Sequence, residues 1–130
     1  MLVHPVSVFI VDDSPQLTEM LGELFSDPGN IEIAGSADSA KKAIDDIRRS
    51  CPDVVIVDLQ LKEGDGFDVV KAIRALPQAK DVVIIFFSNH ASRELHRHAV
   101  ALGADFFLDK TKDHAKVLEI LQEIVRARQT

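Results

Sequence analysis

Cysteine is nearly absent from this chain of 130 residues. Cys51 is the only one, so no disulfide can form within the chain, and a reducing compartment is the natural interpretation. A chain of this length is expected to form a single domain over residues 1–130. It can bury an adequate core without covalent cross-links.

Basic clusters and long apolar runs are also missing. The chain has 15 Lys and Arg against 21 Asp and Glu, for a formal net charge of −6. Nucleic acids and anionic membranes attract clustered cations, so we expect neither as a direct partner. No run approaches the ~20 apolar residues that cross a bilayer, and residues 1–5 lack the basic start and apolar stretch of a signal peptide. A cytoplasmic location is therefore expected.

The chain instead shows a regular alternation of short apolar runs and helical patterns. The runs are rich in Val, Ile and Phe, which favour strands, and the segments between them carry apolar residues at helical spacing. We expect strands near 6–11, 31–35, 54–57, 82–87 and 106–108, and helices near 17–25, 39–49, 67–76, 91–102 and 112–128, with Asp-Pro-Gly at 27–29 ending the first helix. This alternation predicts an α/β fold in three layers, with helices on both faces of a doubly wound, five-stranded parallel sheet.

Polar residues follow four of the five apolar runs. They are Asp12 and Asp13 after the first run, Asp58 after the third, Ser88 after the fourth and Lys110 after the fifth. Any one of them alone is better explained as a helix cap or turn residue. Ligands of open α/β sheets, however, bind at the carboxyl ends of the strands. Five such residues at that edge therefore indicate a functional site.

Three carboxylates at one edge repel one another, and their crowding should raise at least one pKa unless a cation intervenes. A hard divalent cation such as Mg²⁺, or Mn²⁺ in its place, prefers oxygen ligands and suits two or three carboxylates. Lys110 supplies a further positive charge. The sequence therefore predicts a divalent metal site beside an ammonium group.

The chain resembles the receiver domains of two-component response regulators, of which the chemotaxis regulator is a stand-alone example. The resemblance extends over essentially the whole length and rests on four fragments in order. The first is Val8-Phe9-Ile10-Val11-Asp12-Asp13; the second, around the third run, is the pair Val57-Asp58-Leu59 and Gly64-Asp65-Gly66; the third is Gly103-Ala104-Asp105 and the fourth Asp109-Lys110. It implies the flavodoxin-like strand order 2-1-3-4-5.

The resemblance also implies a role for each site residue. Asp58 would accept a phosphoryl group, assisted by Lys110 and Ser88; Mg²⁺ would be held by Asp12, Asp13, Asp58 and the backbone carbonyl of Gln60; and Ser88 and Phe107 would form a conformational switch. The donor would be a histidine kinase or a histidine phosphotransfer protein, because the chain has no phosphate-binding loop of the Walker type. Such a domain catalyses only its own phosphorylation and dephosphorylation.

Output is expected through the face formed by the 91–102 helix, the last strand and the last helix. Its candidate contacts to a downstream protein are Arg93, His96, Arg97, Phe106, Lys112 and His114. His96 and His98 are two residues apart and do not share a helix face, so surface histidines are favoured over a metal site.

Some positions depart from the usual pattern of the family. Thr111 stands where a Pro commonly follows the Lys, and Asn89 replaces a small residue beside Ser88. Gln60 and His90 occupy two positions that modulate dephosphorylation in the family. These departures affect the lifetime of the phosphoryl group and the geometry of the switch.

Three alternatives share much of this pattern. The chain could be a receiver domain excised from a longer response regulator or hybrid kinase, or a pseudo-receiver that docks a partner constitutively. A phosphatase of the haloacid-dehalogenase type also uses an aspartyl nucleophile, but it needs an acid two residues later, where this chain has Gln60.

Overall fold

Five parallel strands form the centre of the molecule, in the order β2-β1-β3-β4-β5. The structure is a computed structural model that describes residues 4–26, 30–90 and 92–128. The strands are β1 (Val6–Val11), β2 (Ile31–Ala37), β3 (Val54–Val57), β4 (Val83–Ser88) and β5 (Phe106–Asp109). The predicted α/β class and the strand order 2-1-3-4-5 are both confirmed.

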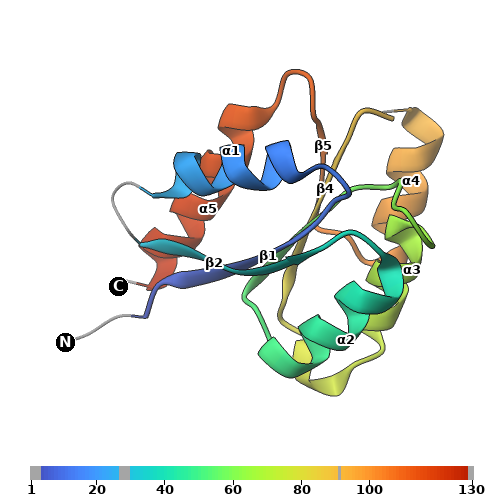
Figure 1. Cartoon of the computed structure of the whole chain (residues 1–130), viewed down its shortest axis with the longest axis horizontal. Coiled ribbons are helices and arrows are strands. Elements are labelled where there is room, and N and C mark those ends of the chain that lie inside the picture. Colours follow the sequence, from blue (N-terminus) through green and yellow to red (C-terminus); the bar gives the residue numbers. More distant parts are fainter. Residues whose placement is uncertain (1–3, 27–29, 91, 129–130) are drawn as a thin grey trace.

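Helices cover both faces of the sheet, which makes the three expected layers (Figure 1). They are α1 (Pro15–Phe25), α2 (Ala40–Ser50), α3 (Gly66–Arg74), α4 (Arg93–Leu102) and α5 (His114–Arg128), with a short 3₁₀ helix at Pro77–Ala79. α1 and α5 pack on one face, and α2, α3 and α4 pack on the other. Among the residues that the structure describes, no helix has the length and apolar character needed to cross a membrane.

Polar caps set where the helices begin. The side chains of Ser14, Ser39, Asp65 and Ser92 each accept a hydrogen bond from a backbone N–H in the first turn of the helix that follows. The helix expected from 91 therefore starts at Arg93, after the Ser92 cap, while Ala91 lies outside the described residues. The last helix starts at His114 rather than at 112. The expected stop at 27–29 also lies outside the described residues.

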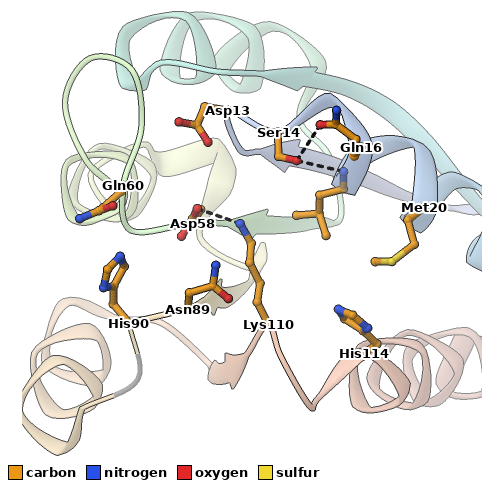
Figure 2. A pocket seen from close by; sticks show the side chains of 11 residues that line it. Asp13, Ser14, Gln16, Met20, Asp58, Gln60, Asn89, His90, Lys110 and His114 are labelled. Carbon is orange, nitrogen blue, oxygen red and sulfur yellow. Dashed lines mark hydrogen bonds and ion pairs between the residues drawn. The ribbon is translucent and has the colours of Figure 1, made fainter.

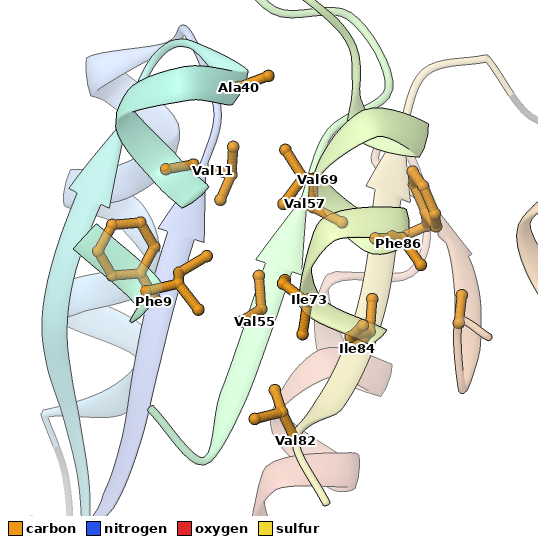
Figure 3. Close-up of a cluster of buried hydrophobic side chains, with 14 of the residues drawn as sticks. Phe9, Val11, Ala40, Val55, Val57, Val69, Ile73, Val82, Ile84 and Phe86 are labelled. Carbon is orange, nitrogen blue, oxygen red and sulfur yellow. The ribbon is translucent and has the colours of Figure 1, made fainter. Parts of the chain in front are cut away.

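The apolar core is split by the sheet into two clusters. One lies between the sheet and α2, α3 and α4, and includes Phe9, Val57 and Phe86 (Figure 3). The other lies under α1 and α5 and includes Ile10 and Leu121. All four residues of β3 are buried, as expected of a central parallel strand covered on both faces. The central strands are therefore the rigid support of the residues that follow them.

Strand register brings the predicted site residues to one edge. Val11 of β1 pairs with Val57 of β3, so Asp12 and Asp58, the next residues along each strand, leave the sheet side by side. Ser88 of β4 pairs with Asp109 of β5, the residue before Lys110. Parallel pairing thus gathers side chains that are up to 98 residues apart in sequence, counting from position 12 to position 110.

The start of α3 packs against the loop that carries Asp58. A methyl group at Gly66 would overlap the backbone carbonyl of Asp58 and lie 2.7 Å from a ring carbon of Phe86. The Gly66 amide also donates to the Leu59 carbonyl at 2.8 Å. Glycine is required here because backbone approaches backbone too closely for any side chain.

We expect Gly66→Ala to lower the free energy of unfolding by about 1–3 kcal/mol, the usual cost of overpacking. Gly22→Ala is the control, because a methyl group inside α1 would make only an ordinary 3.4 Å contact with Ile33. Alanine should stabilise that helix by up to about 1 kcal/mol. Urea unfolding of both variants measures the difference, and equal effects at the two positions would contradict the close approach.

Candidate phosphoacceptor and metal site

Two buried carboxylates share one ammonium group at the carboxyl edge of the sheet. Lys110 Nζ lies 2.5 Å from Asp12 Oδ2 and 2.9 Å from Asp58 Oδ2. The three side chains are only 2%, 10% and 13% exposed for Asp12, Asp58 and Lys110 respectively. The other carboxylate oxygens are also engaged: Asp12 Oδ1 accepts from the Ser14 amide, and Asp58 Oδ1 accepts from the Leu59 amide.

The ionisation of this group follows from burial and from its charges. Burial raises the pKa of Asp12, and the hydrogen bonds from Lys110 and Ser14 offset this only in part, so the pKa stays above its ordinary value of 3.8. Burial alone would lower the pKa of Lys110, but the hydrogen bonds to Asp12 and Asp58 outweigh it and hold that pKa above 10.5. Repulsion from Asp58 is the smallest contribution at Asp12. The expected rise of one acid's pKa is thus present, but desolvation causes most of it.

Asp13 joins Asp12 and Asp58 in a group of three carboxylates. One oxygen from each lies within 4.8 Å of the other two, and Asp13 is the exposed member. Three such hard oxygen donors suit Mg²⁺ or Mn²⁺, and their negative charge exceeds the single positive charge of Lys110. The donor set therefore fits a divalent cation. Gln60 lies in the adjoining loop and forms a backbone bridge with Asp65.

Asp13 and Asp58 open into a pocket of about 480 Å³. Figure 2 shows Gln60 and His90 on one side of Asp58, Asn89 between His90 and Lys110, and Gln16, Met20 and His114 on the other side of Lys110. Leu17 and Met20 of α1 give this second side an apolar wall. Asp58 is thus both held by the protein and reachable from solvent.

Ser88 ends β4 beneath this pocket and is fully buried. Its hydroxyl oxygen accepts a hydrogen bond from the His90 amide at 3.1 Å, and its carbonyl accepts from the Lys110 amide at 3.0 Å. Asn89 and His90 line the pocket, whereas Ser88 is not among the lining residues. Its predicted contact with a phosphoryl group would need the hydroxyl to move outward, and stays a prediction.

The predicted switch aromatic, Phe107, is half-buried within a row of rings. Its ring stacks on Phe86 with centroids 5.7 Å apart and on His96 of α4 at 5.3 Å. Phe86 in turn meets Phe67, which His98 contacts edge-on at 4.4 Å. Both ends of the row contact α4, through His96 and His98, so movement of Phe107 would disturb the packing of that helix. His96 and His98 contact separate rings, in agreement with the expectation that they do not share a face.

Most of the expected output residues lie on the exposed face of α4 and β5. Arg93, His96 and Arg97 are exposed on α4, as are Phe106 on β5 and Lys112 in the following turn. His114 differs, because it is half-buried, lines the Asp58 pocket and contacts Phe87 edge-on. Its ring points toward the site rather than toward the α4 face.

An ion pair at the opposite edge of the sheet was not foreseen. Asp53 accepts from the amide and hydroxyl of Ser7, and Arg128 at the end of α5 pairs with it at 2.6 Å. Burial raises the pKa of Asp53, but the hydrogen bonds from Arg128 and Ser7 together exceed that effect and hold it below 3.8. In the sequence, Asp53 reads only as a turn residue after Pro52, so nothing local marks this contact.

The fold and the site together define a class of protein, an α/β domain with a carboxylate triad and a lysine at the carboxyl edge of its sheet. The family model of the response regulator receiver domain matches residues 8–122. The chain therefore belongs to the response regulator receiver domain family.

Solved structures agree with this assignment. A chain of the CheX–CheY–BeF3–Mg²⁺ complex from Borrelia burgdorferi superposes with a TM-score of 0.83 at 26% identity, covering 93% of this chain and 90% of that one. Chemotaxis protein CheY4 of Vibrio cholerae gives a TM-score of 0.81 at 29% identity, covering 92% and 98% respectively.

Among curated proteins, protein-glutamate methylesterase/protein-glutamine glutaminase 1 of Xanthomonas campestris pv. campestris is 38% identical over 127 residues. The match covers 95% of this chain but 35% of that protein. The chain thus spans about a third of the length of the methylesterase relatives it matches.

Removal of the shared ammonium should destabilise the protein in a pH-dependent way. We expect Lys110→Met to lower the free energy of unfolding by about 3 kcal/mol at pH 7, because two buried carboxylates lose their partner. The loss should shrink as the pH falls through the raised pKa of Asp12, since protonated carboxyls need no counter-charge.

At the alkaline end, the wild-type advantage should persist to about pH 10.5 and disappear as the pH rises through the elevated pKa of Lys110. Urea unfolding without divalent cations at pH 4, 7, 10 and about 11.5 measures both ends of this dependence. Lys112→Met is the control, because Lys112 is exposed and its removal should change stability by less than about 0.5 kcal/mol. An equal loss for Lys110→Met at every pH would contradict the ion-pair account.

Proposed function

We propose that this chain is a phosphoacceptor module of a two-component phosphorelay. Asp58 receives a phosphoryl group from a phosphohistidine, and the protein signals by a change in conformation. The observation that carries the proposal is the state of the Asp58 carboxylate. It lines an open pocket while Lys110 and the Leu59 amide hold its two oxygens at 2.9 and 2.7 Å.

The transfer would exchange one bond to phosphorus for another. A carboxylate oxygen of Asp58 forms the new bond to phosphorus, the bond from phosphorus to the donor nitrogen breaks, and that nitrogen keeps the electron pair. Phosphoryl transfer demands positioning and charge stabilisation above all. Lys110 is placed to offset charge on the transferred oxygens, and the backbone amide at Asn89 is a candidate hydrogen-bond donor to them.

A divalent metal fits the site, because Asp12, Asp13 and Asp58 present three oxygens within 4.8 Å of one another. The backbone carbonyl of Gln60 is the further ligand we propose. A bound Mg²⁺ would offset the negative charge of the carboxylates and of the incoming phosphoryl group. Asp12 would act through its buried ion pair with Lys110 as much as through the metal.

Partner and output surfaces follow from the same geometry. The donor would be a histidine kinase or histidine phosphotransfer protein, whose imidazole must enter the pocket beside Asp58. Output would pass from Ser88 through Phe107 and its stacked partner His96 to the exposed face of α4, β5 and α5, where a downstream protein binds.

We propose that this receiver domain occupies residues 1–130 and turns over no substrate besides its own phosphoryl group. The methylesterase relatives are longer proteins, so their activity is not transferred to this chain. The exposed free thiol of Cys51 suits a reducing compartment, which favours a cytoplasmic location.

Incubation with acetyl phosphate and Mg²⁺ should add one phosphoryl mass to the protein, and chelation of the metal should prevent it. Asp58→Asn should abolish the gain, because the amide is no nucleophile. Asp38→Asn is the matched control: Asp38 follows β2 at the same edge but pairs with Lys62 outside the triad, and this variant should be labelled like the wild type. Intact-mass spectrometry reports the result. Labelling of Asp58→Asn, or none of the wild type by any donor, refutes the proposal.

Asp13→Asn should weaken Mg²⁺ binding by about tenfold or more, the scale on which loss of a supporting carboxylate acts. The same change should raise the melting temperature of the metal-free protein by about 2 °C, since it removes one of three crowded like charges. Thermal unfolding across a Mg²⁺ titration gives both values. Glu23→Gln, an exposed acid on α1, should alter neither, and a lower metal-free melting temperature for Asp13→Asn would count against crowding.

A further inference from the structure

Lys110 lies on a short turn whose other residues are tied to one another. β5 ends at Asp109 and α5 begins at His114, so Lys110 belongs to neither element. Its ammonium must nevertheless reach Asp12 and Asp58 on the first and third strands. A flexible four-carbon side chain on a loose turn would hold such a position poorly.

The side chains of Asp109, Thr111 and Asp113 remove that looseness. Asp109 Oδ1 accepts from both the amide of Thr111 at 2.7 Å and its hydroxyl at 2.6 Å. Asp113 Oδ2 accepts from the Asp109 amide at 2.8 Å, and the Asp113 amide donates to the Asp109 carbonyl at 2.8 Å. The backbone is thus closed into a box on both sides of Lys110.

The Lys110 backbone has an anchor of its own. Its amide donates to the Ser88 carbonyl at 3.0 Å, which joins the turn to the end of β4. The Lys110 side chain is left to point into the pocket beside Asp58 (Figure 2). Backbone and neighbours together therefore determine where the ammonium stands.

Three of the bonds in the box are of the strong kind, because their acceptors are carboxylates: Asp109 accepts two and Asp113 accepts one. The hydroxyl and amide of Thr111 hold the pKa of Asp109 below its ordinary value, so this carboxylate stays charged at neutral pH. Thr111 occupies the position where the resemblance would place a Pro. In this chain the hydrogen-bonded box, which we also call the clamp on Lys110, restricts the backbone where a proline ring would otherwise do so.

We propose that Asp109 and Thr111 are positioning residues for phosphoryl transfer, which set the Lys110 ammonium against the group on Asp58. This inference rests on the proposed function of Asp58. The simpler reading is that the box merely caps α5. The two readings differ in what removal of the Thr111 hydroxyl does at Asp58, because sub-ångström placement matters for transfer but not for capping.

The test compares Thr111→Val, which keeps the shape and removes the hydroxyl, with Thr111→Ser, which keeps the hydroxyl. Thr111→Val should slow phosphorylation of Asp58 by acetyl phosphate about tenfold. It should also weaken binding of beryllofluoride, a phosphoryl mimic, by about tenfold at saturating Mg²⁺. Mg²⁺ affinity should change by less than about twofold, because Lys110 and not the metal ligands is displaced. Thr111→Ser should behave as the wild type in all three measurements.

Asp109→Asn is the second variant, and it should reproduce the loss seen for Thr111→Val. Urea unfolding of each variant shows that the folded protein is being compared. Unchanged rate and unchanged beryllofluoride affinity in Thr111→Val, with only stability reduced, overturn the inference, as does a Thr111→Ser variant that fails to recover.

The two proposals fail separately. If the wild type binds beryllofluoride tightly but accepts no phosphoryl group, the proposed function is refuted. The beryllofluoride affinities of the variants then still test whether Asp109 and Thr111 position Lys110. A wild type that is labelled normally, alongside an equally active Thr111→Val, refutes the clamp alone. If the wild type neither binds beryllofluoride nor is labelled, both are overturned.

Discussion

One ammonium group between two buried carboxylates is the interaction on which this site depends. Lys110 joins the end of β5 to Asp12 and Asp58 at the ends of β1 and β3. Because both carboxylates are buried, removal of the ammonium leaves two uncompensated negative charges, at a cost that exceeds the gain from forming the pair. The ion pairs of Lys110 with Asp12 and Asp58 therefore connect the ends of three strands. The three carboxylates together carry more negative charge than Lys110 offsets, and a divalent cation fits that excess.

Three parts of the molecule hold the backbone next to these charged residues. The buried residues Val8–Val11 of β1 and Val54–Val57 of β3 fix the backbone below Asp12 and Asp58. The close approach at Gly66 holds the loop after Asp58, and the hydrogen-bonded turn at 109–113 holds Lys110. Each support acts on the backbone adjacent to a site residue. The phosphoryl transfer that we propose depends on such placement of the reacting groups.

The output route that we propose, from the site to the surface, lies on the α4 side. Ser88, buried beneath the pocket, ends the strand that carries Phe86, and Phe86 stacks with Phe107. His96 and His98 place an imidazole against each end of the Phe67–Phe86–Phe107 row. Because α4 contacts both ends of the row, we expect displacement of one ring to shift the whole helix. Packed cores are not continuously deformable.

Much of this protein could be predicted from its residues in order. The alternation of apolar runs with helical spacing determined the α/β class, because a parallel strand buried on both faces admits little besides Val, Ile and Phe. Residues 12, 13, 58, 88 and 110 stood out because each lies within two residues of the end of a run, and carboxyl ends of parallel strands share an edge. The helix expected from 91 starts two residues later, after the Ser92 cap, and the last helix starts at His114 rather than at 112.

Tertiary structure alone decided what those residues touch. Lys110 pairs with both Asp12 and Asp58, burial outweighs charge repulsion in raising the pKa of Asp12, and Ser88 is fully buried. All three depend on packing between segments that are distant in sequence. The same holds for His114, whose ring turns to Phe87, and for Asp53, bound by residues 46 positions before it and 75 after it, Ser7 and Arg128. Periodicity reports which face of an element is buried. Distances between side chains on different elements arise only once the sheet and its helices have packed.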